Sequence, residues 1–146
     1  MGKTMELVTE HLARCVTTLE SAVELLGRAS PESVEYEVYR NAAVKGFELA
    51  LDTSGKLLRR ALKEYSGSPR AIDELSYKEV FREALKHGLV ADADTVRRWF
   101  AYRDNRNSTA HDYGIGFAEE TLKLLPTFLL DVKKLEFILR QRFAHA

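Results

Sequence analysis

The sequence contains one cysteine, Cys15, so it cannot form an intramolecular disulfide, as is typical of proteins in a reducing compartment. Neither sign of charge dominates: 22 Lys and Arg residues balance 22 Asp and Glu residues, which excludes a strongly basic nucleic-acid coat and an acidic solvating tail. The longest strongly apolar run, residues 124–130, is far shorter than the roughly 20 residues that cross a bilayer. The N-terminus lacks the apolar segment of a secretory signal. We therefore expect a cytoplasmic protein with no membrane partner.

Metal-binding and cofactor-binding patterns are also missing. The four histidines are scattered, with no two of them three or four residues apart and no His-Glu-x-x-His sequence, so no zinc or di-iron pattern is formed. No glycine-rich loop has the spacing that cradles a phosphate or a dinucleotide. We expect no metal and no cofactor.

What the sequence does contain is typical of one globular domain, residues 1–146. Apolar residues make up 45% and charged residues 30%, which are ordinary values for a soluble domain. A chain of this length buries enough surface to fold without a disulfide or metal.

Apolar residues recur every three or four positions, and no window alternates with the period of two that indicates a strand. Start and stop signals divide the chain into five helices. The first ends near Gly27, and the second runs for roughly 35 residues from Ser30-Pro31-Glu32 to Gly67. A short helix follows from the capping box at Ser76 to Gly88, then a helix from Asp92 to Gly114 and a last helix from Phe117. Pro126 predicts a kink or a restart in the last one. We expect an all-α fold, an antiparallel up-and-down bundle of four main helices plus a short one.

Gly46 and Gly55 lie inside the long second helix, where each costs about 1 kcal/mol relative to alanine. Two interpretations are open: the glycines are simply tolerated, or a neighbouring helix approaches the backbone closely at these positions.

Residues 102–113 combine two arginines, two asparagines, a histidine and two tyrosines near a helix end. On an ideal helix Arg103, Asn107 and His111 are four residues apart and share one face, with Arg106 about 60° to the side of Arg103. Guanidinium groups bind phosphate oxygens, and a histidine with an unperturbed pKa of about 6.5 can transfer protons at physiological pH. The alternative is that the arginines form surface ion pairs and the histidine caps the helix. RNA binding by this neutral chain would need a local patch of Arg97, Arg98, Arg103 and Arg106.

Arg106, His111 and Tyr113 form the pattern Arg-x4-His-x-Tyr, with Asn107 directly after the arginine. This pattern resembles the Arg-x4–6-His motif of the HEPN superfamily. More narrowly, it is similar to the form found in HepT-type toxins and in nucleotidyltransferase substrate-binding proteins. The resemblance continues through residues 39–58, 68–70, 81–90 and Trp99, so that it spans most of residues 35–125.

The resemblance implies a HEPN-like bundle that forms a homodimer, or a higher oligomer, with the motif helices at the two-fold axis. It also implies a metal-independent endoribonuclease in which Arg106 and His111 are catalytic and the products end in 2′,3′-cyclic phosphates. The implied partner is a minimal nucleotidyltransferase, the antitoxin of a toxin–antitoxin system, which transfers AMP to Tyr113. We expect Arg103 and Asn107 to bind the RNA or nucleotide substrate.

Two other functions stay open at this point. In one, the same residues hold a nucleotide for a partner transferase without catalysing a reaction. In the other, the chain is a dimerisation module with no ligand. A pure binding site has no evident need for a histidine that titrates near neutrality, which favours the nuclease.

Overall fold

The computed structural model describes residues 7–109 and 115–143, and every regular element in this part of the chain is helical. The elements are α1 (Glu10–Arg28), α2 (Val34–Leu62), the 3-10 helix η1 (Lys63–Tyr65), α3 (Pro69–Asp73), α4 (Tyr77–Lys86), α5 (Ala93–Thr109) and α6 (Ile115–Phe143). The predicted all-α class is confirmed, with α1, α2, α5 and α6 as the main helices and α4 as the short one. α3 is one helix more than the sequence pattern predicts.

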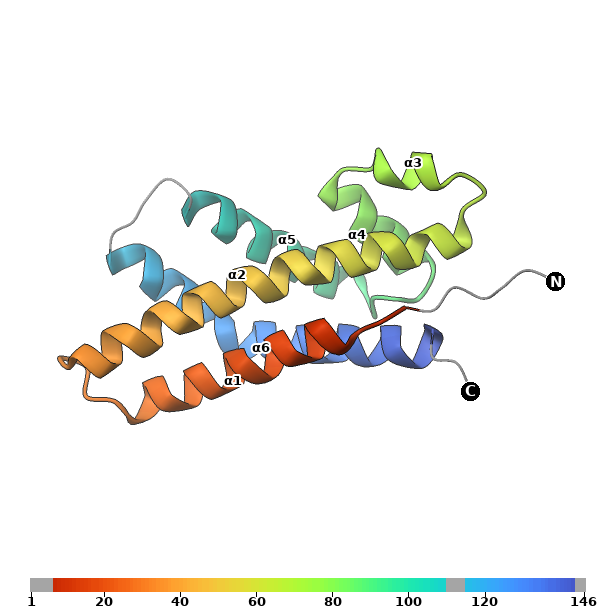
Figure 1. Ribbon diagram of the computed structural model, residues 1–146. Helices are drawn as coiled ribbons and strands as arrows, with labels where there is room; N and C mark the ends of the chain where they lie inside the picture. Colours follow the sequence, from red (N-terminus) through yellow and green to blue (C-terminus); the bar gives the residue numbers. More distant parts are fainter. Residues whose placement is uncertain (1–6, 110–114, 144–146) are drawn as a thin grey trace.

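α2 is the central helix, because each of the other helices packs against it. Consecutive long helices run in opposite directions, α1 against α2 and α5 against α6 (Figure 1). α5 also runs antiparallel to α2, on the side where α4 lies. The antiparallel arrangement that we expected is therefore present.

Two of the helix starts that the capping residues predict are present, and one is not. The capping box before α4 is present: the Ser76 hydroxyl accepts from the Glu79 amide, and the Glu79 carboxylate accepts from the Ser76 amide, each at 3.2 Å. Asp92 caps α5 by accepting from the Thr95 amide at 2.8 Å. The predicted start of α2 at Ser30-Pro31-Glu32 is wrong, since α2 begins at Val34.

The start of α2 is displaced because Ser33 competes with Ser30 as the capping residue. The Ser33 amide donates to the Ser30 carbonyl at 2.9 Å, which closes a turn around Pro31. The Ser33 hydroxyl then accepts from the Tyr36 amide at 3.1 Å and caps the helix. Proline therefore occupies a turn here, and not the first helical position.

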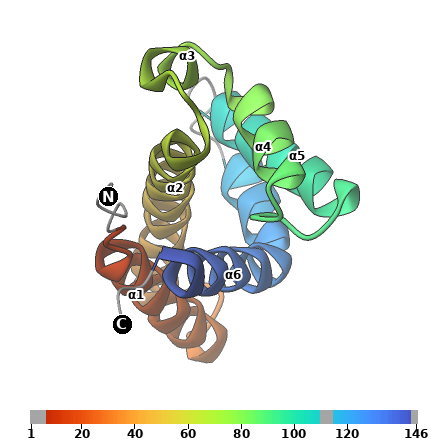
Figure 2. The same ribbon diagram turned by 90° about the vertical axis from the view of Figure 1, so that its right-hand side faces the viewer.

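α6 is one continuous helix although Pro126 lies inside it, so the predicted restart does not occur. Its ribbon changes direction between the N-terminal and C-terminal halves (Figure 2), as expected for a helix that contains a proline without an amide donor. Within residues 7–109 and 115–143, no helix has both the length and the apolar character that a bilayer crossing requires.

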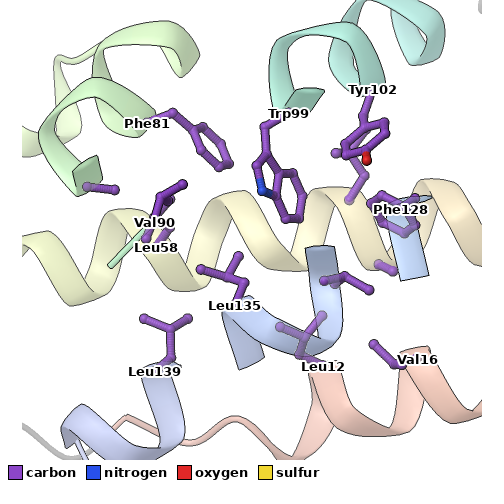
Figure 3. Close-up of a cluster of buried hydrophobic side chains, with 14 of the residues drawn as sticks. Leu12, Val16, Leu58, Phe81, Val90, Trp99, Tyr102, Phe128, Leu135 and Leu139 are labelled. Carbon is purple, nitrogen blue, oxygen red and sulfur yellow. The ribbon is translucent and has the colours of Figure 1, made fainter. Parts of the chain in front are cut away.

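Five buried aromatic side chains join four helices in one core (Figure 3). Their ring centroids lie 4.8 to 6.4 Å apart, mostly edge to face; the cluster is Phe47, Phe81, Trp99, Tyr102 and Phe128. Trp99 is 1% exposed and lies at the centre of this core. Because Trp99 and Tyr102 both come from α5, this cluster sets the position of that helix.

A buried polar contact, which we call the Asp131 clamp, ties α5 to α6. The Asp131 carboxylate accepts from Arg98 through Nε at 2.8 Å and Nη2 at 2.9 Å, and from the Tyr102 hydroxyl at 2.5 Å. Burial, together with the hydrogen bond to this carboxylate, raises the pKa of Tyr102, so the hydroxyl stays protonated as a donor. Asp131 is 7% exposed, so its charge is compensated by these donors and only slightly by water.

Gly46 is the place where α1 approaches α2 most tightly among the glycines. A Cβ atom there would lie 3.2 Å from Leu19 Cδ1 and 3.5 Å from the Leu19 Cα.

We predict that Gly46→Leu lowers the free energy of unfolding by at least about 1 kcal/mol despite the better helix propensity of leucine. Urea unfolding measures the change. The control is Gly27→Ala, since nothing lies within 4 Å of a Cβ at Gly27; equal stability of Gly46→Leu and wild type would show that the two helices can separate freely.

The Asp131 clamp predicts a second stability effect. Asp131→Ala removes three charge-assisted hydrogen bonds and leaves the buried Tyr102 hydroxyl without its acceptor, so we expect a loss of about 2 kcal/mol. Thermal unfolding followed by circular dichroism measures it. The matched control is Glu24→Ala, which breaks only an exposed ion pair with Arg28 and should change stability by less than about 0.5 kcal/mol. Similar effects of both substitutions would contradict a structural role of the clamp.

Candidate functional site at the end of α5

α5 presents different side chains to different neighbours. Trp99 and Tyr102 face the core, and Arg98 binds Asp131 on α6. Arg103 and Arg106 instead contact residues of α4 and α2. The helix therefore separates a structural side from a side that carries two guanidinium groups.

Arg106 lies beside a carboxylate of α2. Its Nη2 atom is 3.9 Å from Glu48 Oε2, and the two side chains are 30% and 20% exposed. Glu48 is also 3.8 Å from the ammonium group of Lys45, one turn earlier on α2. A half-buried arginine with a carboxylate at this distance is held in place but still reaches the surface.

Arg103 is anchored by an aromatic ring. Its guanidinium carbon lies 4.9 Å from the ring centroid of Tyr77, the first residue of α4, in a cation–π contact. The Tyr77 hydroxyl donates to the Trp99 carbonyl at 3.5 Å. Burial raises the pKa of Tyr77 strongly, and the charge of Arg103 offsets only part of that effect. Tyr77 is therefore a neutral platform for Arg103.

The last described turn of α5 is fixed to α6 by Asn105. Its side-chain amide donates to the Thr121 hydroxyl at 2.9 Å, and Thr121 is fully buried. This bond joins the two helices on either side of residues 110–114, so it positions the end of α5 that carries Arg106.

The predicted site residues have different placements. Arg103 and Arg106 both lie on the side of α5 that contacts α2 and α4, and both are half-buried. Asn107 is exposed. His111 and Tyr113 lie outside the described residues. The roles assigned to these five residues stay predictions.

The expected basic patch is smaller than four arginines. Arg98 is bound to Asp131 in the clamp, and Arg97 pairs with Asp94 in the first turn of α5. Of the four arginines, Arg103 and Arg106 are the two whose side chains lie on the side of α5 that faces α2 and α4. In the part of the chain that the structure describes, no three His, Cys, Asp or Glu side chains gather as a metal site.

Three residues beside the arginines are absent from the predicted site: Glu48 and Asp52 on α2, and Asn105. Glu48 and Asp52 are four residues apart, so the sequence indicates that they share one face of α2. Nothing in the sequence shows that α5 packs beside that face. Asn105 stands within the motif segment, yet its partner Thr121 is distant in the sequence. Two arginines one turn apart on α5, with carboxylates of α2 nearby, suit recognition of a ligand that carries phosphates together with hydroxyl or amino donors.

Comparisons with known proteins agree with one another. The family model described as nucleotidyltransferase substrate binding protein like matches residues 8–141. A protein of Haemophilus influenzae named probable ribonuclease HepT is 34% identical over 100 residues, which cover 68% of this chain and 66% of that relative, just under two thirds of its length.

A solved structure from Haemophilus influenzae has the same fold. HI0074, described as revealing the fold of a substrate binding domain of a nucleotidyltransferase, is 27% identical with a TM-score of 0.80. The match covers 92% of this chain and 100% of HI0074. With the family model spanning nearly the whole chain, this protein belongs to the nucleotidyltransferase substrate-binding protein family.

Proposed function

We propose that this protein is a metal-independent endoribonuclease that acts through Arg106 and His111. The observation that carries the proposal is the position of Arg106, half-buried beside Glu48 at the end of α5 that leads directly to His111. A relative of this family is named a probable ribonuclease, which supports the same activity. The RNA itself supplies the nucleophile, its ribose 2′-hydroxyl, so no metal-bound water is needed.

In the proposed reaction His111 accepts the proton of the 2′-hydroxyl. The 2′-oxygen then bonds to the adjacent phosphorus while the bond from phosphorus to the 5′-oxygen breaks, and a second imidazole protonates the leaving 5′-oxygen. The guanidinium of Arg106 stabilises the charge that grows on the phosphorane oxygens. The products carry a 2′,3′-cyclic phosphate and a 5′-hydroxyl.

One chain has one Arg-x4-His-x-Tyr motif, so the second imidazole comes from a second copy. We propose that two copies associate as a homodimer with the ends of α5 facing each other, because an isologous interface brings two identical sites together. One His111 then acts as base and the other as acid.

We also propose that the protein works with a minimal nucleotidyltransferase in a toxin–antitoxin pair. In this pair Tyr113 accepts AMP through its hydroxyl, with release of pyrophosphate from ATP. The added phosphate places negative charge and bulk two residues from His111, and so excludes an RNA phosphate.

A second candidate function is a nucleotide-binding subunit without nuclease activity. The similarity to HI0074, described as a nucleotidyltransferase substrate binding domain, favours it. In that case Arg106→Ala abolishes binding of AMP, and the wild type cuts no RNA even at high protein concentration.

The nuclease proposal predicts that purified wild-type protein cuts single-stranded RNA in the presence of EDTA. His111→Ala should lower the cleavage rate at least about 100-fold, because it removes the acid–base group. Gel analysis of labelled RNA, with phosphatase treatment to identify cyclic ends, measures both results. His11→Ala on α1 is the matched control, since it removes an exposed imidazole far along the sequence from the motif. Undiminished cleavage by His111→Ala would rule out the mechanism.

The modification proposal predicts that Tyr113→Phe no longer accepts AMP. Incubation with a cognate nucleotidyltransferase and ATP should add one AMP to the wild type and none to Tyr113→Phe, as measured by intact-protein mass spectrometry. Tyr65→Phe is the control, because the Tyr65 ring is 38% exposed and lies outside the motif. Equal labelling of Tyr113→Phe and wild type would move the modification to another residue.

A further inference from the structure

A cleft between α2, α4 and α5 adjoins the Arg106 site. It has a volume of ≈ 240 Å³. The side chains and backbone that matter for its chemistry are Asp52, Gly55, Lys56, Arg59, Tyr77 and Arg103. Arg103, which lines the cleft, is three residues before Arg106 on α5, a distance of about 4.5 Å along the helix axis. The cleft therefore lies next to Arg106 along α5.

Two of the three cations in the cleft are available to a ligand. The Arg59 guanidinium is committed to the main chain, because it donates to the carbonyls of Ile72 at 2.7 Å and Leu75 at 2.9 Å. Lys56 is exposed, and in the described part of the chain neither Lys56 nor Arg103 belongs to an ion pair. The guanidinium of Arg103 contacts the ring of Tyr77, and a guanidinium that lies on a ring keeps N–H donors at its edge that can bind other acceptors.

The remaining groups fit a nucleotide better than a bare anion. Asp52 lines the cleft with the two cations and offers carboxylate oxygens to ribose hydroxyl or base amino donors. Tyr77 supplies an aromatic wall. Gly55 lets α2 approach the edge of this ring, since a Cβ there would lie 3.6 Å from Tyr77 Cε2, and a longer side chain would take up space that borders the cleft. A phosphate alone would gain nothing from the carboxylate or the ring.

We propose that this cleft binds a nucleotide of single-stranded RNA adjacent to the phosphate held at Arg106, with Lys56 and Arg103 contacting its phosphate group. The proposal rests on the RNA-cleaving function above and extends it to a second position on the strand. It makes Lys56 a substrate-binding residue. It also explains how a chain with zero net charge binds RNA, because Arg103 and Arg106 of α5 act together with Lys56 of α2.

The test uses the full chain carrying His111→Ala, so that bound RNA is not cut. Binding of a labelled single-stranded decanucleotide is followed by fluorescence anisotropy over a range of salt concentrations. Adding Lys56→Ala should weaken binding roughly fivefold and reduce the magnitude of the slope of log affinity against log salt by about 0.7, the value for one phosphate contact on a single strand. Lys56→Arg, which keeps the charge, should restore the slope.

Lys86→Ala is the matched control. It removes the same charge from an exposed lysine of α4 that pairs with Glu83 and does not line the cleft, so affinity and slope should equal those of the parent protein. Thermal unfolding confirms that each variant is folded, as expected for exposed side chains.

The outcomes separate this proposal from the nuclease proposal. If the wild type cuts RNA but Lys56→Ala binds the decanucleotide with the parent's affinity and slope, the cleft proposal is overturned and the nuclease stands. If the wild type cuts no RNA but Lys56→Ala reduces RNA binding and slope as described, the cleft proposal stands alone. A loss of binding to free AMP with unchanged binding to RNA overturns it in favour of a free-nucleotide site.

Discussion

The position of α5 depends on its contact with the core of the bundle, above all on the Asp131 clamp and the aromatic cluster around Trp99 and Tyr102. α5 carries few apolar residues, so it is attached through a small number of large side chains and one buried carboxylate. Tyr102 belongs to both groups, because its ring packs on Phe128 while its hydroxyl binds Asp131. Together with the Asn105–Thr121 bond at the last described turn, these contacts keep Arg103 and Arg106 beside α4 and α2.

The same packing sorts the arginines into two groups. Arg98 and Arg59 are used internally, one for a carboxylate and the other for main-chain carbonyls. Arg103 and Arg106 keep a route to solvent, although a ring and a carboxylate restrict their motion. Restricted guanidinium groups lose less entropy when they bind phosphate. A balanced total charge is therefore compatible with a local anion-binding surface, because some arginines are used inside the fold while Arg103 and Arg106 lie where a ligand can reach them.

Some features follow from local sequence and others do not. The capping box at Ser76 and the cap at Asp92 form as predicted, since each involves groups within three residues of one another. The start of α2 at Val34 is missed because Ser30 and Ser33 both qualify as caps, and only the turn around Pro31 selects between them. Helix α3 is missed because it has five residues, too few for a periodic pattern, and is held by hydrogen bonds from Arg59.

The sequence by itself determines the helical class, the approximate helix limits and a motif segment with two arginines, because periodicity, caps and spacing are properties of neighbouring residues. Tertiary structure decides which residues surround those arginines. Glu48, Asp52 and Tyr77 come from other helices and reach α5 only through the crossing of α2, α4 and α5. The close contact at Gly46 also appears only when α1 lies on α2. Side chains far apart in sequence meet through packing, and no local pattern encodes that meeting.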